Sequence, residues 1–145
     1  MLNYRKDYGI VNMLNIIKTK KRKSMTDNEK WYWLYSAKGG KMTVAKLAER
    51  VGDINELYDN IEIIQPRGKR EEKAVNALIL AKRSEEYRYE FERFSGRGVK
   101  FLTRQENTLP SSVLDVSSVQ YLYTLGNYEC LESPCAAIVG SREAG

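Results

Sequence analysis

The sequence predicts an α+β chain in which a helical region comes first and the opening strands of an α/β sheet follow. Up to residue 94, apolar residues recur at the helical spacings of three and four, whereas from residue 99 they gather in three short runs. Gly96 and Gly98 mark the change. With 145 residues, 42% of them hydrophobic and 30% charged, the chain suits one ordinary domain, or a small domain with part of a second.

Residues 1–24 form a basic extension. They hold seven Lys or Arg and one acid, Asp7, for a net charge of +6. The whole chain has 24 basic and 19 acidic residues, so residues 25–145 hold 17 and 18 and carry a net charge of −1. An arm for phosphates or for an anionic membrane is one interpretation of the extension. A disordered tail, or a stretch translated from an upstream start codon, is the favoured one.

Residues 25–97 are expected to form a helical domain that begins with three short helices. Thr26 or Asp27 caps the first helix, which places Trp31, Leu34 and Tyr35 on one face, and Gly39–Gly40 ends it. Thr43 is expected to cap a second helix that ends at Gly52, and Asp53 a third.

The "KGGK" turn at residues 38–41 does not fit a Walker A loop, because Tyr35 stands at the first glycine position and Met42 follows the lysine. An ordinary interhelix turn is favoured over a helix-hairpin-helix turn that holds a DNA phosphate.

The longest helix is expected over about 25 residues, 70–94. One continuous apolar stripe runs along it, formed by Ala77, Leu80, Ser84, Tyr87, Phe91 and Phe94. A stripe of this kind is typical of core packing and is not taken as a ligand platform.

Three strands are predicted after the helical region, at residues 99–103, 120–126 and 135–140. A loop with a short turn joins the first two. The third, "CAAIVG", is apolar without interruption, which is typical of a parallel strand buried on both faces. It runs directly into Gly140, Ser141 and Arg142.

That loop has the chemistry of an anion site. Gly140 lets backbone amides approach an oxyanion, Ser141 adds a hydroxyl donor, and Arg142 supplies a charged fork of donors. Many such turns contain Gly-Ser without binding anything, so the loop alone leaves phosphate binding open. A G-x-G-x-x-G dinucleotide fingerprint is not met, because Gly140 and Gly145 have no middle glycine.

Composition argues against several other classes of function. The chain has no histidine and two cysteines, Cys130 and Cys135, which excludes histidine-based catalytic dyads and argues against a zinc site. We expect no cofactor, no metal, no catalytic residue and no enzymatic activity. No apolar run approaches the ~18 residues of a membrane span, and no secretion signal is apparent, so a cytoplasmic protein is expected.

The segment "YTLGNYECLESPCAAIVGSREAG" resembles the DNA-processing protein A (DprA/Smf) family around its first central strand, where the pattern ends in I-V-G-S-R. Upstream, "EKWYWLYSAKGGKMTVAKLAERVGDINELYDN" resembles the family's helical N-terminal domain. The stretch "FERFSGRGVKFLTRQENTLPSSVLDV" resembles its connector. The resemblance covers roughly residues 28–145 and is most specific at residues 138–142.

The resemblance implies a SAM-like or helix-hairpin-helix-like domain over residues 25–97 and the beginning of a Rossmann-like domain over 98–145. The family binds single-stranded DNA, passes it to the RecA recombinase in natural transformation, and forms homodimers. Gly140, Ser141 and Arg142 match its GSR loop, whose arginine meets a DNA phosphate.

This sequence departs from the family pattern in two places and stops early. Leu109-Pro110 stands for a Tyr-Pro pair, and Ser118-Val119 for a Pro pair. The 145 residues stop before the family's second glycine-rich motif, so we expect them to bind DNA weakly on their own. Two alternatives stay open, namely a nucleotide-binding enzyme of the phosphoribohydrolase type and a helical domain that acts as a protein interaction module.

Overall fold

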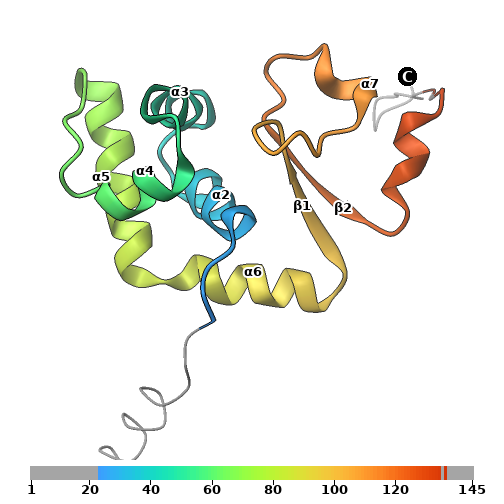
Figure 1. Cartoon of the computed structure of the whole chain (residues 1–145), viewed down its shortest axis with the longest axis horizontal. Helices are drawn as coiled ribbons and strands as arrows, with labels where there is room; N and C mark the ends of the chain where they lie inside the picture. The colour runs from blue at the N-terminus through green and yellow to red at the C-terminus, as the bar shows by residue number, and fades with distance from the viewer. Residues whose placement is uncertain (1–22, 135, 137–145) are drawn as a thin grey trace, which may run out of the picture.

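The structure, a computed structural model, describes residues 23–134 and residue 136 (Figure 1). Its helical part comprises α2 (Asp27–Ser36), α3 (Lys41–Val51), α4 (Ile54–Asn60), α5 (Lys69–Ser84) and α6 (Glu86–Gly96). Then follow β1 (Val99–Thr103), α7 (Ser111–Leu114), β2 (Tyr121–Leu125) and the 3-10 helix η1 (Tyr128–Glu132). Helices and strands are thus both present, and the predicted α+β class is confirmed.

The two predicted strands that the structure describes form an antiparallel pair, with Val99 opposite Leu125 and Thr103 opposite Tyr121. Of the third predicted strand only residue 136 is described, and of the basic extension only residues 23 and 24. The boundary between residues 25–97 and 98–145 stays a prediction.

Trp33 lies at the centre of the helical core with none of its surface exposed. Its indole Nε1 donates a hydrogen bond to the carbonyl oxygen of Leu78, 3.1 Å away, so the one polar atom of the ring is satisfied in the core. The ring of Tyr58 meets it edge-on, with 4.8 Å between centroids. Around it pack fully buried side chains from four helices and the residue after α4: Leu34, Leu47, Leu57, Ile61 and Leu78.

Three helix boundaries follow the predicted signals. The Thr26 hydroxyl accepts a hydrogen bond from the amide of Glu29, which caps α2. Asp53 caps α4 by accepting from the amides of Asn55 and Glu56. Gly52 ends α3 with a φ of 90°, a left-handed conformation that glycine adopts readily.

The prediction that Thr43 caps α3 is wrong, because the helix begins two residues earlier, at Lys41. Gly40 holds the N-cap position with a φ of 84°, which lets the chain enter the helix sooner. Gly39 brings this interhelix turn against α5, since a Cβ there would lie 3.1 Å from the Cα of Ala74. The "KGGK" segment therefore serves as a closely packed connection between α2 and α3.

The prediction of a single helix of about 25 residues is also wrong. The chain breaks at Glu85, whose φ of 55° separates α5 from α6. A left-handed residue of this kind costs about 1–2 kcal/mol, and the break lets α6 turn under α2. Apolar periodicity did not reveal it, because the spacing of the stripe continues across the break.

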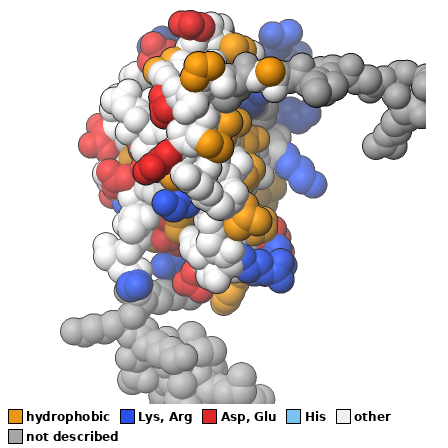
Figure 2. All heavy atoms as spheres, turned by 90° about the vertical axis from the view of Figure 1, so that its right-hand side faces the viewer, with side chains coloured by type: hydrophobic (Ala, Val, Ile, Leu, Met, Phe, Trp, Pro, Cys, Tyr) orange, Lys and Arg blue, Asp and Glu red, His pale blue; other side chains and the backbone are white. Residues whose placement is uncertain are grey.

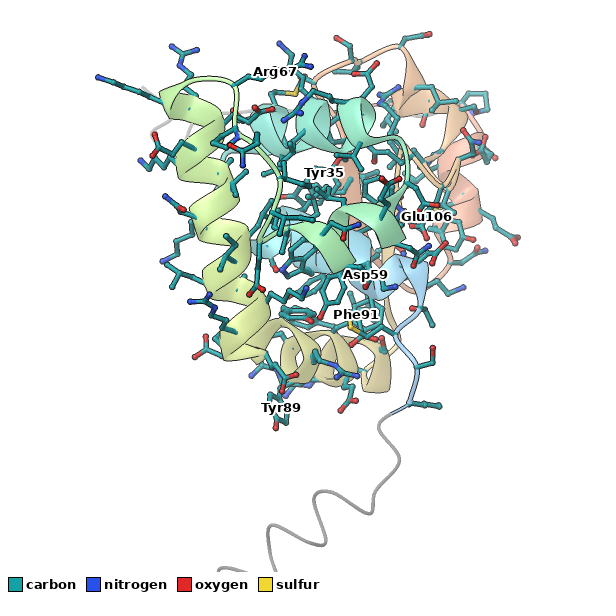
Figure 3. The ribbon with its side chains drawn as sticks, turned by 60° about the vertical axis from the view of Figure 1, so that its left-hand side comes forward. Tyr35, Asp59, Arg67, Tyr89, Phe91 and Glu106 are labelled. Atoms are coloured by element: carbon teal, nitrogen blue, oxygen red, sulfur yellow. The ribbon has the colours of Figure 1, made fainter. Side chains whose placement is uncertain are left out.

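The buried face of α5 differs from the predicted apolar stripe. Leu80, predicted to be core, is 67% exposed, and the buried residues are Ala74, Val75 and Leu78. On α6 the predicted stripe is confirmed, because Tyr87 is buried and Phe91 and Phe94 pack against the core. In Figure 3, Phe91 points into the molecule, whereas Tyr89 points away from it.

An aromatic cluster joins the strands to the helices; it consists of Tyr32, Tyr35, Phe94, Phe101, Tyr121 and Tyr123. Phe101 on β1 is its centre, with centroid distances of 5.4 Å to Tyr32 and 5.3 Å to Tyr123. Asn28 of α2 also donates a hydrogen bond to the carbonyl oxygen of Phe101, 2.8 Å away. The strand pair thus packs directly on α2 and α6.

Candidate functional site

The residues predicted to bind DNA phosphate, Gly140, Ser141 and Arg142, lie outside the described residues. Their role stays a prediction.

A groove of about 640 Å³ lies between α3 and the connection from β1 to β2. We call it the α3 groove. Its volume falls within the ~300–1,000 Å³ that is typical of small-molecule sites. The α3 helix lines it with Met42, Ala45, Lys46, Ala48 and Glu49, and Gly52 adds the residue that ends this helix. Trp31 of α2 and the residues Arg104, Gln105, Ser117 and Gln120 complete the lining. In Figure 1, α3 and the β1–β2 connection face each other across the upper part of the molecule.

Arg104 shapes the strand side of this groove. Its guanidinium donates hydrogen bonds to the carbonyl oxygens of Val119 (2.9 Å), Leu114 (3.0 Å) and Val116 (2.8 Å), and more weakly to that of Val113 (3.4 Å). One side chain thereby ties together the turn that contains α7. Since these partners are neutral carbonyls, the positive charge of Arg104 is not paired with a carboxylate among the described residues.

Gln105 is held by two partners. Its Nε2 donates to the hydroxyl of Tyr35, 2.7 Å away, and to Oε1 of Gln120, 3.1 Å away. Burial raises the pKa of Tyr35 to about 12, although the hydrogen bond from Gln105 lowers it in part, so the phenol is neutral at neutral pH. Gln120 in turn donates to the carbonyl oxygen of Ser117. The carboxamide of Gln105 is therefore fixed, and its own Oε1 accepts no hydrogen bond from the described part of the chain.

The strand-bearing side of the molecule carries exposed apolar side chains. Figure 2 shows hydrophobic side chains running down this side, next to Lys and Arg side chains. Leu125 is 73% exposed and Tyr123 48%. Both lie on β2, the strand whose second edge has no strand partner within the described residues.

The features of the described ranges that bear on metal ions and membranes are the grouping of metal-ligating side chains and the length and apolarity of the helices. Within residues 23–134 and 136, no group of three or more His, Cys, Asp or Glu side chains is placed to hold a metal ion. None of the helices there combines the length and apolarity that crossing a bilayer requires.

The groove residues were missed as a site by the sequence analysis. The helical spacing places Trp31 on one face with Leu34 and Tyr35, and no motif in the sequence distinguishes Lys46 or Gln105. One signal was available, since Arg104 and Gln105 directly follow a predicted strand, where polar residues often serve binding. Their convergence with Trp31 joins segments more than 70 residues apart, and no local pattern reports it.

Comparison of the chain with protein-family models, with curated proteins and with solved structures finds no match.

Proposed function

We propose that this chain is the N-terminal portion of a DprA-like protein, which binds single-stranded DNA and passes it to a RecA-type recombinase during natural transformation. The observation that carries the proposal is the run Ile138-Val139-Gly140-Ser141-Arg142 at the end of an apolar segment. The order of elements agrees with it, because a helical unit precedes the strands 99–103 and 121–125. On this proposal the protein is a cytoplasmic, non-enzymatic DNA-binding protein, its fold is completed as a Rossmann-like domain, and the whole protein is a homodimer.

The proposed loop contacts the phosphate backbone of the DNA. Gly140 leaves room for amides to approach a phosphate oxygen, Ser141 donates its hydroxyl, and Arg142 donates two parallel hydrogen bonds to one phosphate. Contacts of this kind position a strand without reading its sequence. Binding is therefore expected to weaken as salt rises, because each neutralised phosphate releases condensed counterions.

The test is fluorescence anisotropy of a labelled single strand with the 145-residue chain, at low salt, where weak binding is measurable. Arg142→Ala should lower the affinity about tenfold and reduce the slope of log K against log salt by about 0.7, the share of one phosphate on a single strand. Arg97→Ala is the matched control, because Arg97 is exposed and its side chain makes no hydrogen bond or ion pair within the described residues. Equal affinity of the wild type and Arg142→Ala would contradict the role of Arg142.

A further inference from the structure

The α3 groove has the lining of a site for a planar, polar ligand. Six of its eleven lining residues are polar or charged, and two of the remaining five are the alanines Ala45 and Ala48. Aromatic, carboxamide and ammonium groups together are the set that proteins use on unpaired nucleic-acid bases and their backbone.

Trp31 offers the aromatic surface. The chain has two tryptophans, and they differ sharply, because Trp33 is fully buried whereas Trp31 is only partly buried and lines the groove. The ring of Tyr35 lies nearly parallel to that of Trp31, at 23° and with 6.4 Å between centroids. This contact fixes the indole before any ligand arrives. Stacking of one base on such a ring is worth a measurable part of the affinity for single strands.

Gln105 offers a fixed acceptor. Its Nε2 is engaged with Tyr35 and Gln120, so Oε1 is held in place with no donor from the described residues. A carboxamide oxygen accepts hydrogen bonds from the amino groups of adenine, cytosine and guanine. An unpaired thymine donates its N3–H to the same kind of acceptor, so Oε1 can engage any of the four bases of a single strand.

The charge around the groove suits a phosphate. Lys46 is exposed and makes no ion pair within the described ranges, and Arg104 adds a charge that only carbonyl oxygens contact. Glu49 is the one carboxylate in the lining, so the groove keeps a net charge of about +1 from its two cations and one anion.

From these contacts we propose that the α3 groove binds a base of the single strand, stacked on Trp31 and hydrogen-bonded to Oε1 of Gln105, with Lys46 on the adjoining phosphate. The inference rests on the proposed function and extends it, because it assigns base contacts to the helical part of the chain. The Gly140–Arg142 loop would then supply contacts to the phosphates of the DNA, and the groove a contact to a base.

Tryptophan fluorescence tests the stacking contact in the 145-residue chain. A short oligodeoxyadenylate should quench the emission of Trp31 and leave that of the buried Trp33. In Trp31→Phe, which keeps an aromatic ring in the packing, the remaining emission should not change on titration. Quenching that survives in Trp31→Phe overturns the stacking assignment.

Affinity measurements test all three contacts. Trp31→Ala and Lys46→Glu should each weaken binding of the oligodeoxyadenylate, the first about tenfold. Arg93→Glu is the matched control for charge, since Arg93 is exposed on α6 and lines no part of the groove. Gln105→Met keeps the size of the side chain and removes the acceptor, so it should weaken binding of the oligodeoxyadenylate, and an unchanged affinity overturns the role of Gln105. An equal loss with Arg93→Glu and Lys46→Glu overturns the role of Lys46.

The variant Arg142→Ala separates this inference from the proposed function. If Arg142→Ala weakens binding while the wild-type complex shows no quenching of Trp31, the groove inference falls and the proposed function stands. If Arg142→Ala binds as the wild type does and Trp31 is still quenched, the groove inference stands and the role of the loop falls. Quenching by an acidic peptide, but by no oligonucleotide, overturns the groove inference as stated.

Discussion

The helical part, residues 27–96, and the strand part, residues 99–132, are stabilised in different ways. Of the buried hydrophobic residues that the structure describes, 15 lie in the helical part and three, Phe101, Leu102 and Leu109, in the strand part. Burial of apolar surface is the main favourable term in folding, at ~25 cal/mol per Å². The helical part therefore has its own core, whereas the strand part relies on the helices to cover one face.

Hydrogen bonds replace apolar burial in the strand part. Thr103 is fully buried; its amide donates a hydrogen bond to Oγ1 of Thr108, and its hydroxyl donates one to Oε2 of Glu106, both at 2.8 Å. Glu106 also accepts from Asn28 of α2 at 2.8 Å. Such networks fix one geometry and contribute modest net stability, typically ~1 kcal/mol per bond. On the strand side of the α3 groove, polar contacts therefore hold the chain in shape, whereas the helical side is held by apolar packing.

The largest effect is expected in the helical core. Trp33→Ala should lower the free energy of unfolding by about 3–5 kcal/mol, because it leaves a cavity in the core and removes the hydrogen bond from the indole to the carbonyl oxygen of Leu78. Urea denaturation followed by circular dichroism measures it. Trp31→Phe is the control and should change stability much less. A loss of under about 1 kcal/mol for Trp33→Ala would mean that the helical core does not depend on this residue.

Phe101→Ala tests how far the two parts are coupled. Phe101 is 6% exposed and sits between Tyr32 and Tyr123, so its removal should cost about 3 kcal/mol. Hydrogen exchange should then lose more protection in β1 and β2 than in α3. An equal loss of protection in β1, β2 and α3 would show that the helical part and the strand part unfold as one cooperative unit, which would contradict the difference drawn between them.

Arg104→Ala should act on the strand part alone. The loss of its bonds to the carbonyl oxygens of Leu114, Val116 and Val119 should destabilise that loop by about 2 kcal/mol. Exchange at residues 111–119 should rise while that of α2–α5 is unchanged. Arg97→Ala is the charge-matched control, and an equal rise in that variant would exclude the hydrogen bonds as the cause.

The smallest effect concerns a helix cap. Thr26→Ala should lower stability by about 1 kcal/mol, because the amide of Glu29 loses its acceptor. Thr43→Ala should change it by less than half as much, since Thr43 lies inside α3 and caps nothing. Thermal denaturation compares the pair. A larger loss of stability in Thr43→Ala than in Thr26→Ala would support the sequence-based prediction that Thr43 caps α3.

Local signals in the sequence located most elements but not the path of the chain between them. Thr26, Gly52 and Asp53 marked helix ends correctly, because capping depends on residues within four positions of one another. The strands at 99–103 and 121–125 followed from short apolar runs after a pair of glycines. The break at Glu85 carried no local signal, since a non-glycine residue adopts a positive φ only where packing repays the cost.

The sequence by itself determined the α+β class, the helix ends at Thr26, Gly52 and Asp53, and the apolar residues that could form a core. Tertiary structure alone decided that Leu80 faces solvent, that Phe101 joins the helical core, and that Trp31 meets Gln105 across a groove. The physical reason is distance along the chain. Backbone propensity and capping act over a few residues, whereas burial and side-chain hydrogen bonds, such as that from Asn28 to Phe101, join residues that only the folded chain brings together.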